Sequence, residues 1–217
     1  MSTLAGMPTR VLLVRHGQSE WNAAGRWQGQ QDPPLSDLGR RQARVAAGAL
    51  GSVDAVFASD LQRASETAAI IATELGVLPI VIDPDLKERS AGEWEGLTRA
   101  EIERDWPGYL DPPADEHAGF GPSVERRPPS WEPDASVLAR AMAGLDRIHD
   151  AVGEGDVLAV THGGLIYVLE GHLGAPFGRL ANGGGRWLSV DGDRLTIGER
   201  VLLVGDDGAP ATVPDQI

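Results

Sequence analysis

Short apolar runs alternate with stretches of helical periodicity along most of the chain. The apolar runs predict buried strands at 10–14, 53–57, 78–82 and 157–161. The helical periodicity predicts helices at 36–50, 61–75, 99–105, 134–152 and 165–173. Two later runs, 186–190 and 194–204, flank the turn Asp191-Gly192-Asp193 and predict a β-hairpin. Strands that alternate with helices are typical of a mainly parallel sheet covered on both faces, so we expect a three-layer α/β/α fold.

Capping residues mark the ends of two of these helices. Ser36 is the expected N-cap of the helix at 36–50. Thr98 and Glu101 have the spacing of a capping box, which predicts that the short helix starts at 99 and stops before Pro107.

Three segments show no sustained periodicity. The first, 17–35, is a long loop rich in Asn, Gln, Trp and Gly, and loops of this length are usually functional. The second, 107–133, contains many prolines and several glycines; it is either a lid over a site or a solvated loop. The third, 205–217, is expected to be a frayed tail. With no internal repeat, residues 1–217 are expected to form a single domain.

Charge and composition narrow the function. The chain has 217 residues and a formal net charge of -13, which argues against binding to nucleic acid or to an anionic membrane. It has no cysteine, so disulfides, thiolate metal sites and cysteine nucleophiles are excluded. No run is long enough to span a membrane and the first nine residues do not resemble a signal peptide, so a cytoplasmic protein is expected. In so acidic a chain, a cationic pocket must be a local feature.

Cationic or titratable side chains follow three of the predicted strands. Arg15 and His16 end the first, Arg63 lies just beyond the second, and His162 follows the strand at 157–161. The carboxyl ends of parallel strands are where α/β proteins bind ligands. These side chains are therefore candidates for one shared site.

The segment around His16 also matches a known family pattern. The run Arg15-His16-Gly17, followed by Gln18, Ser19 and Asn22, resembles the signature of the histidine phosphatase superfamily, also called the phosphoglycerate mutase-like fold. Further matches occur in order at 25–29, 34–36, 59–64, 86–88, 94–96 and 161–164. The resemblance covers roughly residues 10–200.

Phosphoryl transfer suits these residue types. A neutral imidazole is available near pH 7, since its unperturbed pKa is about 6.5, so His16 can attack phosphorus and form a phosphohistidine. The transition state spreads negative charge over the phosphoryl oxygens, which the planar donor fork of arginine stabilises. The expected catalytic residues are His16, Glu88, Arg15, Arg63 and His162.

Glu88 is assigned the acid–base role by its motif position. One carboxyl group can protonate the leaving alkoxide and later deprotonate the attacking water. An isolated glutamate here would more often be a solvated carboxylate paired with Lys87 or Arg89, and the flanking motif reverses that preference. Likewise, an isolated His162 would more often be a satisfied core histidine.

Five further residues are expected to bind substrate. The resemblance implies that Asn22 donates to a phosphate oxygen, while Gln28 and Gly29 close over the substrate, Gly29 through its backbone N–H. Loop capping is the competing interpretation for the two amide side chains. Arg26 is expected to add positive charge at the mouth, and Asn182 lies in a segment similar to the family's late Asn-Gly-Ser.

The segment after Glu88 favours hydrolysis over mutation. Cofactor-dependent mutases resemble Glu-Arg-His-Tyr-Gly here and carry paired arginines further on, whereas this chain reads Glu88-Arg89-Ser90-Ala91-Gly92 and 110–113 has no arginine pair. A mutase must hold a second anion and exclude water. We therefore expect a phosphatase, with a phosphoglycerate mutase or a non-catalytic phospho-ligand-binding module as alternatives. Trp131-Glu132-Pro133 departs from the family's Gly-Glu-Ser and puts the local pocket geometry in doubt.

Neither a metal nor a cofactor is expected. The remaining histidines, His117, His149 and His172, show no metal-ligand spacing. The expected partner is a small phosphomonoester substrate. The oligomeric state is left open, with a homodimer among the options.

Overall fold

A six-stranded sheet forms the centre of the computed structural model, which describes residues 8–110, 126–192, 194–205 and 211–212. Its strands are β1 (Thr9–Arg15), β2 (Ala55–Ala58), β3 (Val81–Ile82), β4 (Gly155–Thr161), β5 (Gly184–Asp191) and β6 (Arg194–Leu202). They lie in the order β3-β2-β4-β1-β5-β6. The first four in this order are parallel, and β5 is antiparallel to both β1 and β6. The sheet is therefore mixed, although mainly parallel as expected.

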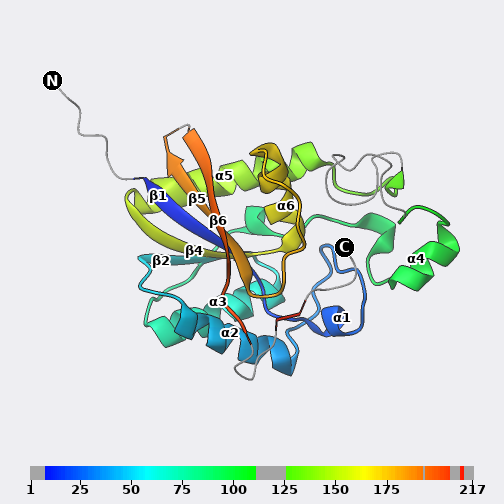
Figure 1. Cartoon of the computed structure of the whole chain (residues 1–217), viewed down its shortest axis with the longest axis horizontal. Coiled ribbons are helices and arrows are strands. Elements are labelled where there is room, and N and C mark those ends of the chain that lie inside the picture. Colours follow the sequence, from blue (N-terminus) through cyan, green and yellow to red (C-terminus); the bar gives the residue numbers. More distant parts are fainter. Residues whose placement is uncertain (1–7, 111–125, 193, 206–210, 213–217) are drawn as a thin grey trace.

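Helices cover both faces of the sheet. In Figure 1, α2 (Asp37–Ala49) and α3 (Gln62–Leu75) lie below the strands, and α5 (Asp134–Val152) and α6 (Gly163–His172) lie above them. The three-layer prediction is confirmed. Shorter elements lie in the connections: the α-helices α1 (Glu20–Ala23) and α4 (Arg99–Asp105), and 3₁₀ turns at Pro84–Leu86 and Gly92–Trp94. Within the described residues, none of the helices combines the length and apolar character that a membrane span requires.

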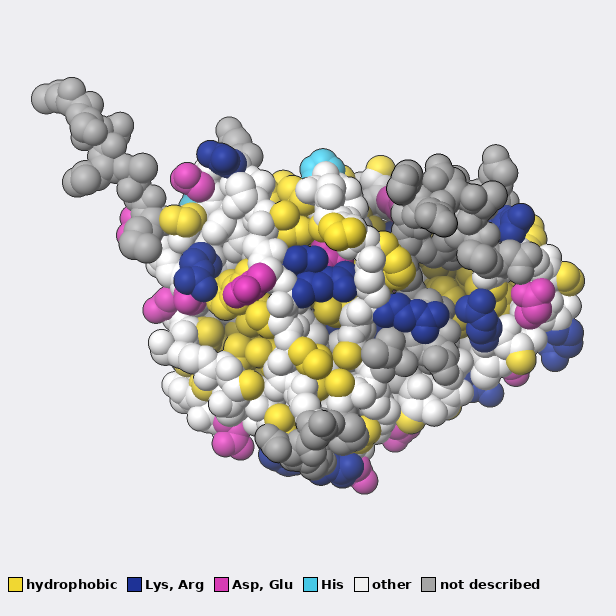
Figure 2. Space-filling model, viewed as in Figure 1, with side chains coloured by type: hydrophobic (Ala, Val, Ile, Leu, Met, Phe, Trp, Pro, Cys, Tyr) yellow, Lys and Arg dark blue, Asp and Glu magenta, His cyan; other side chains and the backbone are white. Residues whose placement is uncertain are grey.

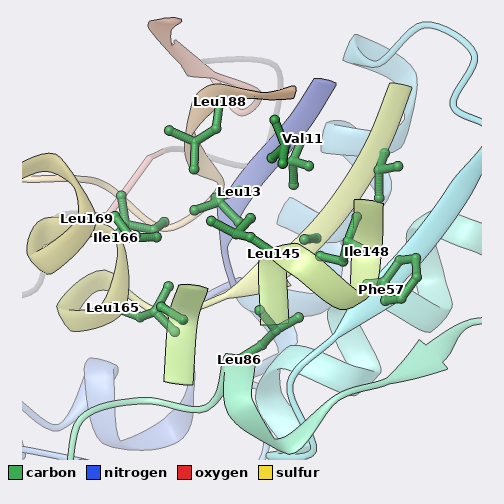
Figure 3. Packing of buried hydrophobic residues seen from close by; sticks show 14 of the residues in the cluster. Val11, Leu13, Phe57, Leu86, Leu145, Ile148, Leu165, Ile166, Leu169 and Leu188 are labelled. Carbon is green, nitrogen blue, oxygen red and sulfur yellow. The ribbon is translucent and has the colours of Figure 1, made fainter. Parts of the chain in front are cut away.

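The central strands are buried on both sides, which explains their continuous apolar sequences. Successive residues of β1 alternate between two cores: Val11 and Leu13 pack under α5 and α6, whereas Leu12 and Val14 pack against α2 and α3. Figure 3 shows the first of these cores, with Leu145 from α5 beside the strand residues. This packing fixes the carboxyl end of β1, where Arg15 and His16 lie.

Local sequence signals set several boundaries. Ser36 caps α2 by accepting from the Gly39 N–H, and Thr98 and Glu101 form the complete capping box of α4. The strand expected at 78–82 is shorter, since only Val81–Ile82 pairs with β2. Pro79 has no N–H to donate to a ladder, which is consistent with that late start.

The excursion at 107–133 lies partly outside the described residues, which omit 111–125. The described part is packed: Trp131 contacts the rings of Trp27 and Trp94, with centroid separations of 5.8 and 5.6 Å. With Ala91 and Ile102 these rings form a third apolar cluster, beside the sheet. The lid hypothesis therefore concerns a segment whose central part is not described.

The tail expected to fray beyond 204 is anchored at one point. Residues 206–210 and 213–217 lie outside the described part. Thr212, however, donates its hydroxyl to Asn182 Oδ1 at 2.8 Å and accepts from the Asn182 N–H at 2.8 Å. Thr212 is therefore bound to the connection that precedes β5.

We expect the core between the sheet and α5 to dominate stability. Leu145 is fully buried there, and truncation to alanine should cost about 2–5 kcal/mol of the free energy of unfolding. Urea titration of Leu145→Ala tests this, with Leu138→Ala, at a half-buried position on the same helix, as the matched control. Equal losses in the two variants would contradict the assignment of the core.

Candidate active site

The carboxyl ends of three parallel strands bring the predicted side chains together. Because β1 pairs with β4 so that Arg15 lies opposite Thr161, the next residue of each strand, His16 and His162, are neighbours. Their ring centroids are 5.1 Å apart. Arg63, at the start of α3, places its Nε 3.2 Å from His16 Nε2. The four residues thus meet as expected for an α/β sheet.

Hydrogen bonds define the tautomer of His16. A guanidinium can only donate, so the contact with Arg63 makes Nε2 of His16 an acceptor. Nδ1 therefore carries the hydrogen and donates to the Gly17 carbonyl at 2.6 Å. Burial, and then the charges of Arg63 and Arg15, lower the pKa of His16 well below its usual 6.5. The imidazole is therefore neutral at physiological pH, with its lone pair on Nε2.

Both arginines are held by backbone carbonyls inside the protein. Arg63 donates to Gly29 and Gln31 at 2.8 and 2.7 Å, and Arg15 donates to Leu180 at 2.7 Å. Burial lowers the pKa of Arg63 to about 10, so it stays charged at neutral pH. On the face shown in Figure 2, by contrast, basic side chains are scattered among acidic and hydrophobic ones. Positive charge at the site is thus an internal feature of an acidic protein.

Several buried polar atoms at the site have no protein partner. Within the described parts of the chain there are six, namely Arg15 Nε, Asn22 Nδ2, His162 Nδ1 and the indole nitrogens of Trp27, Trp94 and Trp131. Burying a polar group without a partner is costly. Arg15, Asn22, Trp27 and Trp131 line one pocket of about 490 Å³, which is open to solvent. The cluster therefore favours a ligand rich in acceptor oxygens.

Glu88 faces this pocket from the loop after β3. Its carboxylate accepts from the Arg89 N–H at 2.8 Å and from the Gly164 N–H, in the first turn of α6, at 3.2 Å. A Cβ at residue 164 would lie 2.4 Å from Glu88 Oε1, so the approach requires glycine. Lys87 pairs instead with Asp60. Glu88 is therefore a half-buried pocket residue and not the ion-pair partner of Lys87.

Arg140 holds the loop that carries Glu88. Its guanidinium donates to the carbonyls of Asp85 at 2.9 Å, Lys87, and Glu88 at 3.1 Å, and to the Glu132 carboxylate at 2.8 Å. Sequence reasoning assigned no role to Arg140. The available signal was its position: it falls in the helical stripe of α5 whose other members are buried apolar residues.

Glu95 links two other loops of the pocket. It accepts from the backbone N–H groups of Gln30 and Ala91 at 3.0 and 3.1 Å. Gly29 has a φ of 51°, and a Cβ there would lie 2.1 Å from Glu95 Oε1. The Gly29 carbonyl in turn accepts from Arg63, so Glu95 supports the segment that orients this guanidinium. The sequence signal was only a motif match without a role.

The five expected substrate-binding residues divide into two groups. Asn22, Gln28, Gly29 and Arg26 line the pocket. Asn182 lies behind it instead: it is fully buried, and its amide donates to the His16 carbonyl at 2.9 Å and to the Asn22 Oδ1 at 3.3 Å. The geometry assigns Asn182 to positioning those two residues and not to direct substrate contact.

Arg26 and Gln28 also make contacts within the protein. Arg26 donates to Glu101 at 3.2 Å and to the Gly96 carbonyl, so its charge at the mouth is compensated. Gln28 accepts from the Ser19 hydroxyl at 2.7 Å. The capping interpretation is confirmed for Asn22, whose side-chain oxygen accepts from the Ser19 N–H at 3.2 Å in the capping box of α1.

The other histidines lie away from the pocket. His149 Nδ1 is 2.6 Å from the Thr9 hydroxyl, His172 is exposed at the end of α6, and His117 lies outside the described residues. In the described part of the chain, no three His, Cys, Asp or Glu side chains come together in a way that could hold a metal ion.

Replacing Arg140, which holds the loop that carries Glu88, should lower kcat more than it raises KM. We expect Arg140→Gln to lower kcat by about 100-fold, because a displacement of about 1 Å in Glu88, the expected acid–base group, would have an effect of this size. Arg140→Lys should not rescue activity, since an ammonium group lacks the fork that spans these acceptors. Steady-state kinetics with Arg147→Gln as control tests this, since Arg147 on the same helix pairs with Asp83 and Asp85. A change confined to KM would contradict the positioning role.

Comparison with known proteins identifies relatives of this chain. The chain is 41% identical over 161 residues to a bifunctional protein of Mycobacterium tuberculosis, covering 72% of this chain and 42% of that protein. It thus spans about two-fifths of the length of that relative. It is 37% identical over 162 residues to a metal-independent phosphoserine phosphatase of Arabidopsis thaliana, covering 73% of this chain and 66% of the relative.

Solved structures and a family model extend the comparison. The mycobacterial glucosyl-3-phosphoglycerate phosphatase, solved in complex with VO3, matches with a TM-score of 0.73 and 31% identity, over 88% of this chain and 97% of that one. A model of the histidine phosphatase superfamily (branch 1) matches residues 11–197. The chain therefore belongs to the histidine phosphatase superfamily, branch 1.

Proposed function

We propose that this protein hydrolyses small phosphomonoesters through a covalent phosphohistidine on His16, without a metal ion. The observation that carries the proposal is the state of His16: a neutral, oriented imidazole whose Nε2 lone pair lies beside a buried guanidinium. The polar atoms without partners on Arg15, Asn22 and His162 supply further contacts for phosphoryl oxygens. Relatives named as phosphatases support the same activity.

In the first step, His16 Nε2 attacks phosphorus. An N–P bond forms while the bond between phosphorus and the ester oxygen breaks, and Glu88 donates its proton to the departing alkoxide. Arg15 and Arg63 stabilise the charge on the equatorial oxygens, in the role that a metal ion has in other phosphoryl-transfer enzymes. The Nδ1–H bond to the Gly17 carbonyl stabilises the positive imidazole of the intermediate.

In the second step, water replaces histidine on phosphorus. Glu88, now a carboxylate, takes a proton from the attacking water as the new P–O bond forms and the N–P bond breaks. His16 returns to its neutral state and inorganic phosphate leaves. The contacts of Glu88 with two backbone N–H groups keep it at the pocket in both steps.

A phosphate-release assay tests the reaction class. The purified chain is incubated with glycerol 3-phosphate, phenyl phosphate, phosphoserine and 3-phosphoglycerate, with and without a chelator. We expect release of phosphate that the chelator does not change. Complete loss with chelator would overturn the metal-free scheme. Conversion of 3-phosphoglycerate to its 2-isomer without phosphate release would indicate a mutase, and binding without turnover of any ester would indicate a binding module.

A further inference from the structure

The pocket has two chemically different ends. Arg15, Asn22 and Glu88 supply polar groups to its lining; Arg15 directly precedes His16 in the chain, so under the proposed function the phosphoryl group lies on their side. The wall also includes Trp27, Ala91 and Trp131, whose surface is apolar apart from the indole N–H of each tryptophan. Under the proposed function, this wall contacts the part of the substrate that leaves as an alcohol.

The two tryptophans of this wall are fixed in place. Their rings meet edge to face, with centroids 5.8 Å apart, and both contact the completely buried ring of Trp94, at 5.3 and 5.6 Å. A rigid aromatic surface of this kind binds flat or ring-shaped groups with little loss of side-chain entropy.

The cations on the wall are already paired. Besides Arg15, the described lining residues include two arginines. Arg26 is bound by Glu101 and the Gly96 carbonyl. Arg89 pairs with Asp134, and its guanidinium lies 5.4 Å from the centroid of the Trp131 ring.

A carboxylate on the leaving group would therefore meet an unfavourable surface. It would lose hydration against indole rings, which offer it two neutral N–H donors but no positive charge. Burying a charge without a counter-ion is costly, whereas an uncharged ring gains from the apolar contact.

We propose that this pocket selects phosphomonoesters whose leaving group is an uncharged ring and discriminates against leaving groups that carry a carboxylate. This rests on the proposed function and deepens it. The named substrates of two relatives, phosphoserine and glucosyl-3-phosphoglycerate, both carry a carboxylate, so the proposal separates this chain from them.

Matched substrate pairs test the discrimination. Phenyl phosphate and 4-carboxyphenyl phosphate differ only in a carboxylate, and glycerol 3-phosphate and 3-phosphoglycerate share a three-carbon skeleton. In each pair we expect kcat/KM to be at least about 10-fold higher for the ester without the carboxylate. The ratio should persist in 0.5 M salt, which screens the repulsion due to the net charge of -13. A ratio of one or below, or its collapse in salt, would overturn the proposal.

Two variants locate the effect on the wall. Glu101→Gln leaves the capping acceptor in place but removes the charge that compensates Arg26, so it should reduce the discrimination within each pair several-fold. Glu103→Gln, at an exposed site on the same helix, is the control.

Trp131→Ala should lower kcat/KM for phenyl phosphate about 10-fold and for glycerol 3-phosphate much less. Trp131→Phe, which keeps an aromatic ring, should retain most of the activity on phenyl phosphate. Unchanged ratios in both Glu101→Gln and Trp131→Ala would overturn the assignment.

A binding measurement separates this proposal from the proposed function. The His16→Ala variant lacks the nucleophile but keeps the wall, so calorimetric affinities for the phenyl and 4-carboxyphenyl esters report the pocket alone. Tighter binding of the phenyl ester supports the selectivity even if the unaltered protein hydrolyses no ester. Such an absence of hydrolysis would defeat only the proposed function. Hydrolysis together with tighter binding of the carboxylate ester would defeat only the selectivity.

Discussion

His16→Asn is expected to lower kcat/KM for every substrate by at least about 1,000-fold, because it removes the imidazole that we propose as the nucleophile. The unaltered protein, mixed rapidly with a ³²P-labelled ester and quenched in base, should carry an acid-labile label that the variant lacks. The amide keeps the side chain close in size, so circular dichroism should show an unchanged fold.

The exposed His172 provides the control for this experiment. His172→Asn should keep both the label and full turnover. Retention of more than about a tenth of the activity in His16→Asn would rule out the covalent route through this residue. Labelling at a different residue would do the same.

Arg63→Gln should have the second largest effect, a loss of about 100-fold to 1,000-fold in kcat/KM. Two consequences follow from removing this guanidinium. The transition state loses a cation, and His16 loses one of the positive charges that lower its pKa, the largest cause being burial. The pKa of His16 should therefore rise, and the neutral imidazole should be lost at a higher pH during acidification.

The pH profile makes this prediction specific. The acid limb of kcat/KM, which lies well below pH 6.5 if His16 sets it in the unaltered protein, should move towards neutrality in Arg63→Gln. NMR titration of the His16 ring should show the same shift. Arg40→Gln is the control, since Arg40 is partly exposed and pairs with Glu66 on the neighbouring helix. An acid limb that stays in place or moves to lower pH would contradict the arrangement.

The fold is largely predictable where its determinants are local. The Ser36 cap and the capping box of Thr98 and Glu101 are contacts within one turn of helix, and both predictions are confirmed. Strands buried on both faces have continuous apolar sequences, so β1 and β4 were also recognisable. The strand at 78–82 was predicted too long, because an apolar run does not reveal how many of its residues find a partner.

The site is predictable only as far as topology determines it. Strand ends bring Arg15, His16 and His162 together because β1 and β4 pair directly. The position of Asn182 was not recoverable, since a motif match does not tell on which side of the His16 backbone the amide lies. The supporting role of Arg140 depends on contacts with carbonyls more than 50 positions away in the chain.

His16 and the aromatic wall of the pocket come from different parts of the molecule. His16 follows the central strand β1 and Arg63 lies in the first turn of α3, whereas Trp27, Ala91 and Trp131 belong to a cluster built from connecting segments beside the sheet. Mutations in that cluster change the surface beside the leaving group while the strand ends keep their register. Duplicated copies of such a gene can thus diverge in substrate specificity while they keep the same catalytic residues. This independence allows one set of catalytic residues to act on many metabolites.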